Sequence, residues 1–181
     1  EKELKKRGIK PLVAVLTPTY QVLSTKPIDD LTNLAGLKIR SPGGTFDNAA
    51  VALKATPVSM PANESYEALQ KGVLGATFAN YIVAEGQKLN ELIKFGTYGA
   101  PLGSFTNTYC INQKVWDSLS PEAQQILAKA GEETMNHLNA ALAKRETELA
   151  KKWGEGGTMR VKYLNAAEQQ QLIELLQPVQ G

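Results

Sequence analysis

The chain has 181 residues, with 20 Lys and Arg against 18 Asp and Glu. Hydrophobic residues make up 43% and charged residues 21%, which are the proportions of a folded globular protein and exclude a disordered chain. A net charge of +2 is too small for a nucleic-acid-binding protein, which needs a clustered basic face, so we expect no nucleic-acid partner.

The first residues carry little information on the compartment. The single cysteine, Cys110, excludes a disulfide within the chain and a cysteine cage for a metal. The sequence starts at Glu1 and shows no signal peptide. We therefore expect a processed or truncated product.

The first half of the chain alternates short extended and helical patterns. Residues 1–8 resemble the last turns of a helix. Short apolar or β-rich runs predict strands at 11–16, 21–24, 37–40, 56–59, 73–78, 92–98 and 105–111. Helices are expected from Phe46, capped by Thr45, to about residue 54, and at 61–71 and 79–85.

Two consecutive strand–helix units, 37–54 and 56–72, have short connections. Such units indicate a parallel α/β sheet. Ligands of these sheets bind beyond the carboxyl ends of the strands. The residues to consider first are therefore Arg40, Ser59 and Phe78.

The second half begins with a strong helix start, because Ser120 can cap the helix and Pro121 suits its first position. A helix over 121–153 would be about 50 Å long, more than a compact domain of this size needs. It either bridges two lobes or projects toward another part. A strand at 158–162 and a helix at 166–176 close the chain.

No membrane-spanning segment is expected. Residues 95–113 lack charged side chains over about the length of a spanning helix. Their Gly, Pro, Ser, Thr and Asn content is typical of loops and strands instead.

Catalytic groups are scarce. His137 lies within the long helix, where a surface or packing role is the simplest interpretation, and Cys110 is expected to be a buried packing thiol. No nucleophile elbow, phosphate loop or dinucleotide fingerprint is present. We expect no catalytic residue, no metal and no cofactor.

Arg40 ends a predicted parallel strand, and Gly43 lies shortly before a helix start. A guanidinium fork beside backbone N–H groups is a good site for a carboxylate. The alternative is a structural ion pair with Glu64 or Asp47. The residues alone leave both interpretations open.

Aromatic residues near the same strand ends could form a pocket wall, namely Tyr20, Phe78 and Tyr81. Each is as compatible with a core position. Glu64 either orients Arg40 or acts as an acid near a helix start.

Four stretches resemble the substrate-binding proteins of TRAP transporters, the DctP-like solute receptors. They are residues 36–44 (GLKIRSPGG), 55–61 (ATPVSMP), 64–73 (ESYEALQKGV) and 111–122 (INQKVWDSLSPE). Their order and spacing agree over essentially the whole chain, which corresponds to the later part of a family member. The first lobe's initial elements are absent.

The resemblance implies a periplasmic, non-catalytic receptor that delivers an organic acid to a TRAP membrane permease. It implies two α/β lobes around a cleft, joined by a long helix, with Arg40 pairing the ligand carboxylate. A pocket Asn or Trp is common in the family at the position where Ala79 stands here, and Asn80 follows one residue later. Some sialic-acid-binding members have a second basic residue at the position of Tyr20, so such a ligand is not implied.

We therefore expect a periplasmic-binding-protein-like α/β fold. One nearly complete lobe would comprise 17–105 and 155–181, while 1–16 and 106–154 would form a first-lobe remnant and the bridging helix. The ligand contacts would come from Arg40 with Tyr20, Gly43, Glu64, Phe78, Asn80 and Tyr81. The alternatives are an interaction module with a structural Arg40 or a small enzyme. A lobe without its partner is expected to dimerise or to exchange elements.

Overall fold

The computed structural model describes residues 2–179, which divide into two compact units. Unit 1 comprises residues 1–18 and 104–144, and unit 2 comprises 19–103 and 145–181. The expected lobes have similar bounds, except on the long helix, where the division falls at 144/145 rather than 154/155. Interpretation of the units as receptor lobes stays a prediction.

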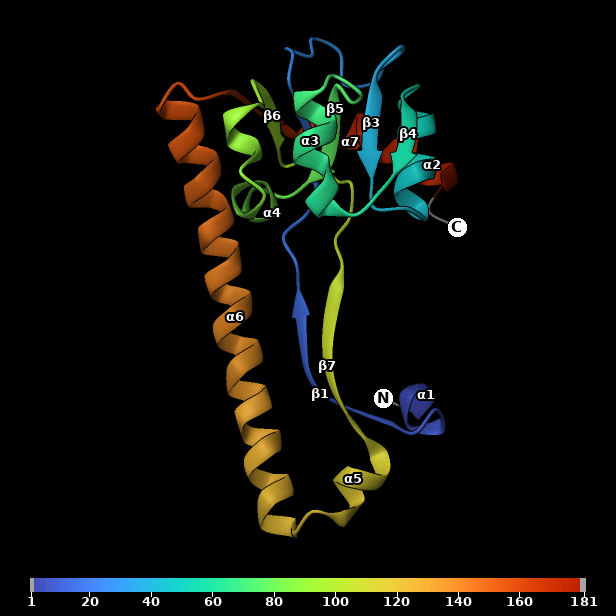
Figure 1. Ribbon diagram of the computed structural model, residues 1–181, viewed down its shortest axis with the longest axis vertical. Coiled ribbons are helices and arrows are strands. Elements are labelled where there is room, and N and C mark those ends of the chain that lie inside the picture. The colour runs from blue at the N-terminus through green and yellow to red at the C-terminus, as the bar shows by residue number, and fades with distance from the viewer. Residues whose placement is uncertain (1, 180–181) are drawn as a thin grey trace. The chain divides into compact units, whose positions relative to one another are not determined.

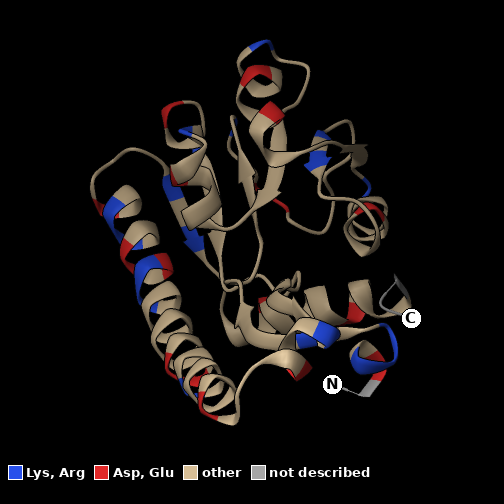
Figure 2. Ribbon diagram, turned by 60° about the horizontal axis from the view of Figure 1, so that its bottom comes forward, with Lys and Arg blue, Asp and Glu red and all other residues tan. Residues whose placement is uncertain are grey.

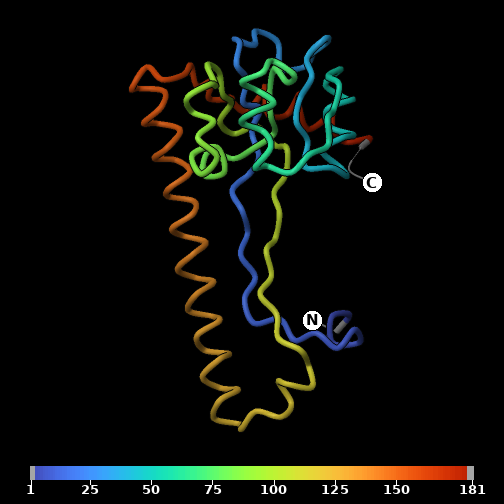
Figure 3. Tube along the Cα trace, in the orientation of Figure 1, coloured from blue at the N-terminus to red at the C-terminus, as the bar shows by residue number. Residues whose placement is uncertain are grey.

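Unit 1 contains a two-stranded antiparallel ribbon of β1 (Ile9–Leu16) and β7 (Thr106–Asn112), which run side by side in Figure 3. Its helices are α1 (Lys2–Lys6), α5 (Gln113–Ser118) and the first part of α6 (Pro121–Glu155). Asn112 begins α5 by accepting a hydrogen bond from the N–H of Lys114.

The ribbon corrects two sequence expectations. The strand 11–16 was expected to be buried, but most of β1 is only half-buried. Cys110, expected to be a packing thiol, is exposed. The reason is the pairing: within the described residues β7 pairs only with β1, so no further sheet layer covers its side chains.

The α6 helix approaches β1 through Gly131. A Cβ atom built at Gly131 would collide with the carbonyl oxygen of Leu12, so only glycine fits this approach. Beside this contact lies a cavity of about 290 Å³. Its lining is mostly apolar and comes from Lys10, Pro11, Leu12, Val13, Ala14, Trp116, Ala128 and Met135. Along α6, both basic and acidic residues occur (Figure 2).

Unit 2 is built on a six-stranded sheet of order β4-β3-β5-β2-β6-β8. The strands are β2 (Gln21–Ser24), β3 (Lys38–Ser41), β4 (Thr56–Ser59), β5 (Ala76–Ala79), β6 (Phe95–Tyr98) and β8 (Arg160–Tyr163). The pairs β3–β4 and β3–β5 are parallel, as the strand–helix units predict, and the pair β6–β8 is parallel as well. Only β2 is antiparallel to its neighbours.

Helices cover both faces of this sheet (Figure 1). They are α2 (Thr45–Ala52), α3 (Ser65–Gln70), α4 (Tyr81–Gly86) and α7 (Ala166–Leu176), with single turns η1 (Ala62–Glu64), η2 (Leu89–Glu91) and η3 (Gln177–Val179). Residues of α2 and α7 share one core cluster, while those of α3, α4 and the end of α6 share the other. Alternation along the strands supplies both clusters, since Val22 belongs to the first and Leu23 to the second.

Several helix boundaries have local causes. Asn165 and Glu168 form a reciprocal capping box that starts α7 at the expected residue. The cap of α2 differs from the expectation, because Gly44, not Thr45, precedes the helix and adopts φ +62°. Strand β5 begins three residues later than expected, since residues 71–75 form a turn containing Gly72 at φ +70°. Within the described residues no helix is long and apolar enough to cross a membrane.

Candidate functional site

Most of the predicted site residues lie where β3, β4 and β5 end. We call this carboxyl end of the three strands the Arg40 edge. Strands β3, β4 and β5 are parallel and therefore end together, at Ser41, Ser59 and Ala79. Strand β2 runs the opposite way, with Gln21 opposite Ala79, so its first residues lie at the same edge. The sheet thus brings Tyr20 close to the ends of β3, β4 and β5, where the ligand site is predicted.

Arg40 is held at this edge by backbone carbonyl groups. Its Nε donates to the carbonyl oxygen of Met60 at 2.9 Å, and its Nη1 donates to that of Phe78 at 3.1 Å. The Tyr20 side chain also hydrogen-bonds the guanidinium. The residue is only 4% exposed, so these contacts fix its direction firmly.

No carboxylate of the described residues forms an ion pair with Arg40. Burial lowers the pKa of Arg40, and the neighbouring Tyr20 partly opposes this effect. Burial likewise raises the pKa of Tyr20, against the opposing charge of Arg40. The positive charge therefore lies in a desolvated setting, balanced by carbonyl and phenol dipoles and not by an acid.

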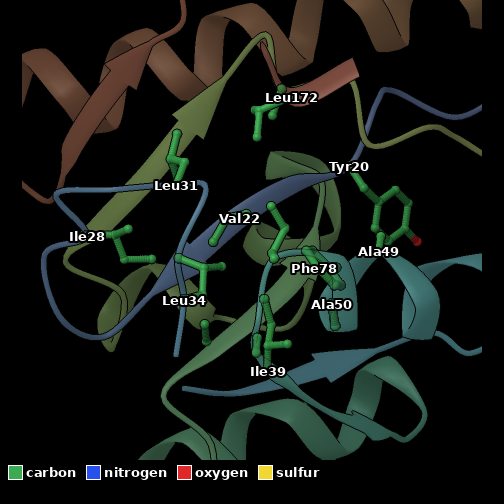
Figure 4. Packing of buried hydrophobic residues seen from close by; sticks show 14 of the residues in the cluster. Tyr20, Val22, Ile28, Leu31, Leu34, Ile39, Ala49, Ala50, Phe78 and Leu172 are labelled. Atoms are coloured by element: carbon green, nitrogen blue, oxygen red, sulfur yellow. The ribbon is translucent and has the colours of Figure 1, made fainter. Parts of the chain in front are cut away.

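Aromatic rings extend the site from Tyr20. Its ring centroid lies 5.0 Å from that of Phe46, which lies 5.8 Å from that of Phe78. Figure 4 shows Tyr20 at the margin of the first core cluster, next to Ala49 of α2. Phe78 is fully buried, so its carbonyl, not its ring, reaches Arg40. Phe46 was not among the predicted site residues, although it lies only two residues after Gly44.

Gly43 forms the turn after β3. It adopts φ +95°, and its N–H donates to the Ser41 hydroxyl at 3.0 Å. A Cβ atom at Gly43 would lie 3.4 Å from the Ser59 hydroxyl. The turn therefore runs close to the end of β4, which is paired with β3 up to Ser41 and Ser59.

Asn80 and Tyr81 begin α4, and both are buried. Asn80 caps the helix by accepting the N–H of Val83 at 2.8 Å. Tyr81 does not line the Arg40 edge as expected. It lies in the second core cluster, where its hydroxyl donates to the Thr97 carbonyl at 2.9 Å and burial raises its pKa.

Glu64 is exposed at the end of η1 and forms no hydrogen bond or ion pair with Arg40. The orienting role considered for it is carried by the carbonyl groups of Met60 and Phe78. Direct ligand contacts of Glu64 and of the other site residues stay predictions.

A buried polar network behind the edge escaped the sequence analysis. Gln21 Oε1 accepts from the Thr97 hydroxyl at 3.0 Å and from the Ala100 N–H at 3.1 Å. Glu146 of α6 accepts from the N–H groups of Tyr81 and Ile82. The polar Gln21 at the start of a strand was the one available signal. Glu146 lies in a helix rich in charged residues, where nothing distinguishes it.

The described residues contain no group of three or more His, Cys, Asp and Glu side chains suited to a metal. His137 lies exposed on α6, far in sequence from the Arg40 edge. What the edge offers chemically is recognition of an anion by a fixed guanidinium.

The chain is similar to known proteins over almost its whole length. Residues 1–180 match the family model described as DctP, bacterial extracellular solute-binding protein, family 7. The C4-dicarboxylate-binding periplasmic protein DctP of Rhodobacter capsulatus is 31% identical over 163 residues, which cover 88% of this chain and 48% of the relative. The chain thus spans about half the length of this curated relative.

Solved structures show the same fold. A TRAP periplasmic solute-binding protein from Bordetella bronchiseptica with bound (R)- and (S)-mandelate is 27% identical, with a TM-score of 0.82 over 97% of this chain and 57% of that chain. One from Pseudomonas aeruginosa with bound L-malate has a TM-score of 0.84 at 18% identity, over 98% and 62%. At such identity the second likeness shows the fold alone. The expected periplasmic-binding-protein-like α/β fold is confirmed.

Proposed function

Because the chain belongs to the bacterial extracellular solute-binding protein family 7, we propose that it forms the anion-gripping part of a TRAP-type organic acid receptor. Arg40 pairs with the ligand carboxylate, and Tyr20, Gly43, Phe78 and Asn80 shape its surroundings. The family is one of solute-binding proteins, which agrees with the expected absence of catalysis.

The observation that carries this proposal is a buried arginine that no carboxylate of the described residues neutralises. A structural arginine in a protein interior is normally paired with an acid. Arg40 has five N–H donors, more than its contacts with Met60 and Phe78 use. An organic anion would neutralise the charge of Arg40 and accept hydrogen bonds from its remaining N–H groups. This favours a receptor over an interaction module with a structural Arg40.

The ligand class follows from relatives as well as from chemistry. The R. capsulatus relative is named for C4-dicarboxylates, and the B. bronchiseptica protein holds mandelate, so the bound molecules carry a carboxylate. Two charged hydrogen bonds contribute about 3–6 kcal/mol. A millimolar dissociation constant corresponds to about 4 kcal/mol. We therefore expect this chain to bind small carboxylates only at millimolar concentrations.

The proposal is tested by ¹⁵N NMR titration of the chain with succinate, L-malate and mandelate, beside neutral succinamide. We expect the Arg40 Nε–H signal and the backbone N–H signal of Gly43 to shift with the acids and not with succinamide. In Arg40→Lys the Nε–H signal no longer exists, and the acids should no longer shift the Gly43 signal, because a lysine cannot present two parallel donors. Shifts that survive in Arg40→Lys, or binding at micromolar concentrations, would contradict it.

A small enzyme is the remaining alternative class. It would need a nucleophile activated by a base near the edge, and the serine hydroxyls there, of Ser41 and Ser59, form no hydrogen bond with a histidine or a carboxylate of the described residues. Turnover in a screen of esterase and phosphatase substrates, lost in Arg40→Lys, would favour it.

The same family membership supports proposals on partner and compartment. The receptor works outside the cytoplasm and delivers its ligand to TRAP membrane permease subunits. Periplasmic location is supported by the name of the R. capsulatus relative. We expect the chain to pull down the permease from detergent-solubilised membranes, and we expect an organic acid ligand to increase the amount of permease recovered.

We also propose that the chain self-associates or exchanges elements. Phe105 and Tyr109 are exposed in or beside the ribbon, and β4 and β8 are edge strands of the unit 2 sheet. Such edges and apolar side chains favour pairing with a second copy. Light scattering should therefore give a mass above that of the monomer, whereas a clean monomer at high concentration would contradict the proposal.

A further inference from the structure

Glu146 is a buried carboxylate on α6, only 6% exposed. Its Oε1 accepts the backbone N–H of Tyr81 at 2.8 Å, and its Oε2 accepts that of Ile82 at 3.1 Å. Both N–H groups belong to the first turn of α4, where the helix itself offers them no acceptor. One side chain of α6 therefore holds the start of a helix far away in the sequence.

The start of α4 is close along the chain to the Arg40 contact. Phe78, whose carbonyl oxygen accepts the Nη1 donor of Arg40, lies only three residues before Tyr81. The connecting residues Ala79 and Asn80 are buried. The segment 78–81 is therefore held at one end by Arg40 and at the other by Glu146.

A second route runs through side chains. The Tyr81 hydroxyl donates to the Thr97 carbonyl, and the Thr97 hydroxyl donates to Gln21 Oε1. Gln21 directly follows Tyr20, the residue that hydrogen-bonds the guanidinium of Arg40. Tyr81, Thr97 and Gln21 are all buried, so water does not compete for these hydrogen bonds.

We propose that Glu146 is a positioning residue for the Arg40 site: by holding the Tyr81 and Ile82 N–H groups, it fixes segment 78–81 and so the direction of the guanidinium. This inference rests on the proposed role of Arg40 in carboxylate binding. It also means that α6 influences how tightly the Arg40 site binds a carboxylate.

The chain offers a matched control on the same two helices. Arg145, the neighbour of Glu146, pairs with Glu85 of α4 at 2.7 Å. This ion pair is partly exposed and lies toward the end of α4, away from segment 78–81. Its loss removes a contact between α6 and α4 without touching the held N–H groups.

The test compares the full 181-residue chain with Glu146→Gln and Glu85→Gln by ¹⁵N NMR. A glutamine has one acceptor oxygen, so Glu146→Gln loses one of the two hydrogen bonds. We expect hydrogen exchange of the Tyr81 and Ile82 amides, and of the Arg40 Nε–H, to rise at least tenfold. The dissociation constant for succinate should rise at least threefold. Glu85→Gln should change neither these exchange rates nor the dissociation constant for succinate by more than twofold.

The outcomes separate the two claims. If Glu146→Gln accelerates exchange at Tyr81 and Ile82 but leaves Arg40 and succinate binding unchanged, the positioning role is overturned and the proposed function stands. If the chain binds no carboxylate, the proposed function fails, and the exchange rate of the Arg40 Nε–H still decides on positioning. If Glu146→Gln does not fold, Glu146→Asp takes its place, because the shorter side chain draws the carboxylate back from the Tyr81 and Ile82 N–H groups, and unchanged exchange at Arg40 in that variant overturns the proposal.

Discussion

Arg40 and Phe78 lie on neighbouring parallel strands and are joined by a hydrogen bond of 3.1 Å from Nη1 of Arg40 to the carbonyl oxygen of Phe78. The register pairs Arg40 with Thr77, so the carbonyl one residue further along β5 comes within reach. A second donor, Nε, reaches Met60 beyond the end of β4. The guanidinium therefore ties three strand ends together while facing the edge where ligands of such sheets bind.

This arrangement predicts a stability cost for Arg40→Lys. A lysine ammonium cannot reach both carbonyl groups in their different directions, so at least one charged hydrogen bond is lost. We expect the free energy of unfolding to fall by about 2 kcal/mol, measured by urea denaturation. The control Lys38→Arg, at an exposed position of the same strand, should change it by less than about 0.5 kcal/mol. Equal stability of both variants would show that the carbonyl contacts do not hold Arg40.

Glu146 predicts a pH dependence of stability. Burial raises the pKa of Glu146 from its ordinary 4.5 to about 7, although the N–H groups of Tyr81 and Ile82 oppose the rise. The folded state thus binds the proton more tightly than the unfolded state. The stabilisation is fully present below about pH 4.5 and is lost as the pH rises through about 7. The pKa difference corresponds to about 3 kcal/mol.

The measurement is urea denaturation of wild type and Glu146→Gln at several pH values between 5 and 8. Around Glu146 the structure places the phenol of Tyr81 and the neighbouring Arg145–Glu85 pair, with Tyr98 and Tyr163 beyond Tyr81. Burial raises the pKa of the Tyr81 and Tyr163 phenols, so both stay neutral over this range. The difference in unfolding free energy between wild type and variant should therefore shrink or change sign toward pH 8. A difference that grows with pH would contradict the raised pKa.

The contact between Gly131 and Leu12 predicts that Gly131→Ala destabilises unit 1. The added Cβ atom would collide with a backbone carbonyl oxygen, which cannot move aside without displacing β1 from α6. We expect a loss of about 1–3 kcal/mol by thermal or urea unfolding. Gly86→Ala is the matched helical control, because its Cβ atom meets nothing within 4 Å. It should be neutral or stabilise by up to about 1 kcal/mol.

The exposed Cys110 predicts fast labelling of the native chain. In a solution dilute enough to dissociate the proposed assembly, a thiol reagent such as DTNB should modify one cysteine per chain, at a rate within about tenfold of that in 8 M urea, because an exposed thiol needs no unfolding. A rate a thousandfold slower in the dissociated chain would contradict the exposure of Cys110, whereas slowing that appears only at high concentration would support self-association through the ribbon.

Local rules were sufficient for most of the fold. The Ser120–Pro121 start located the long helix, and the short units around β3 and β4 gave the parallel pairing. These signals are local because capping and turn formation depend on neighbouring residues. Local signals could not predict that β2 lies antiparallel between β5 and β6, because strand order depends on contacts between residues distant in sequence.

The site was predictable only in part, for the same reason. Arg40 could be identified from its place at a strand end and from the family resemblance. Tyr81 was expected at the edge, but its position on α4 turns its ring into the second core cluster. Glu146 could not be found, because the hydrogen bonds to Tyr81 and Ile82 join residues more than 60 positions apart. Cys110 was misjudged because an apolar strand pattern does not show whether a second layer covers it.

The central claim is that Arg40 grips a carboxylate, and a crystal structure of the chain in about 50 mM succinate tests it most directly. We expect a succinate carboxylate about 3 Å from the Arg40 guanidinium, with the contacts to Met60 and Phe78 kept. Succinate bound elsewhere, with Arg40 still covered by protein atoms, would contradict the account.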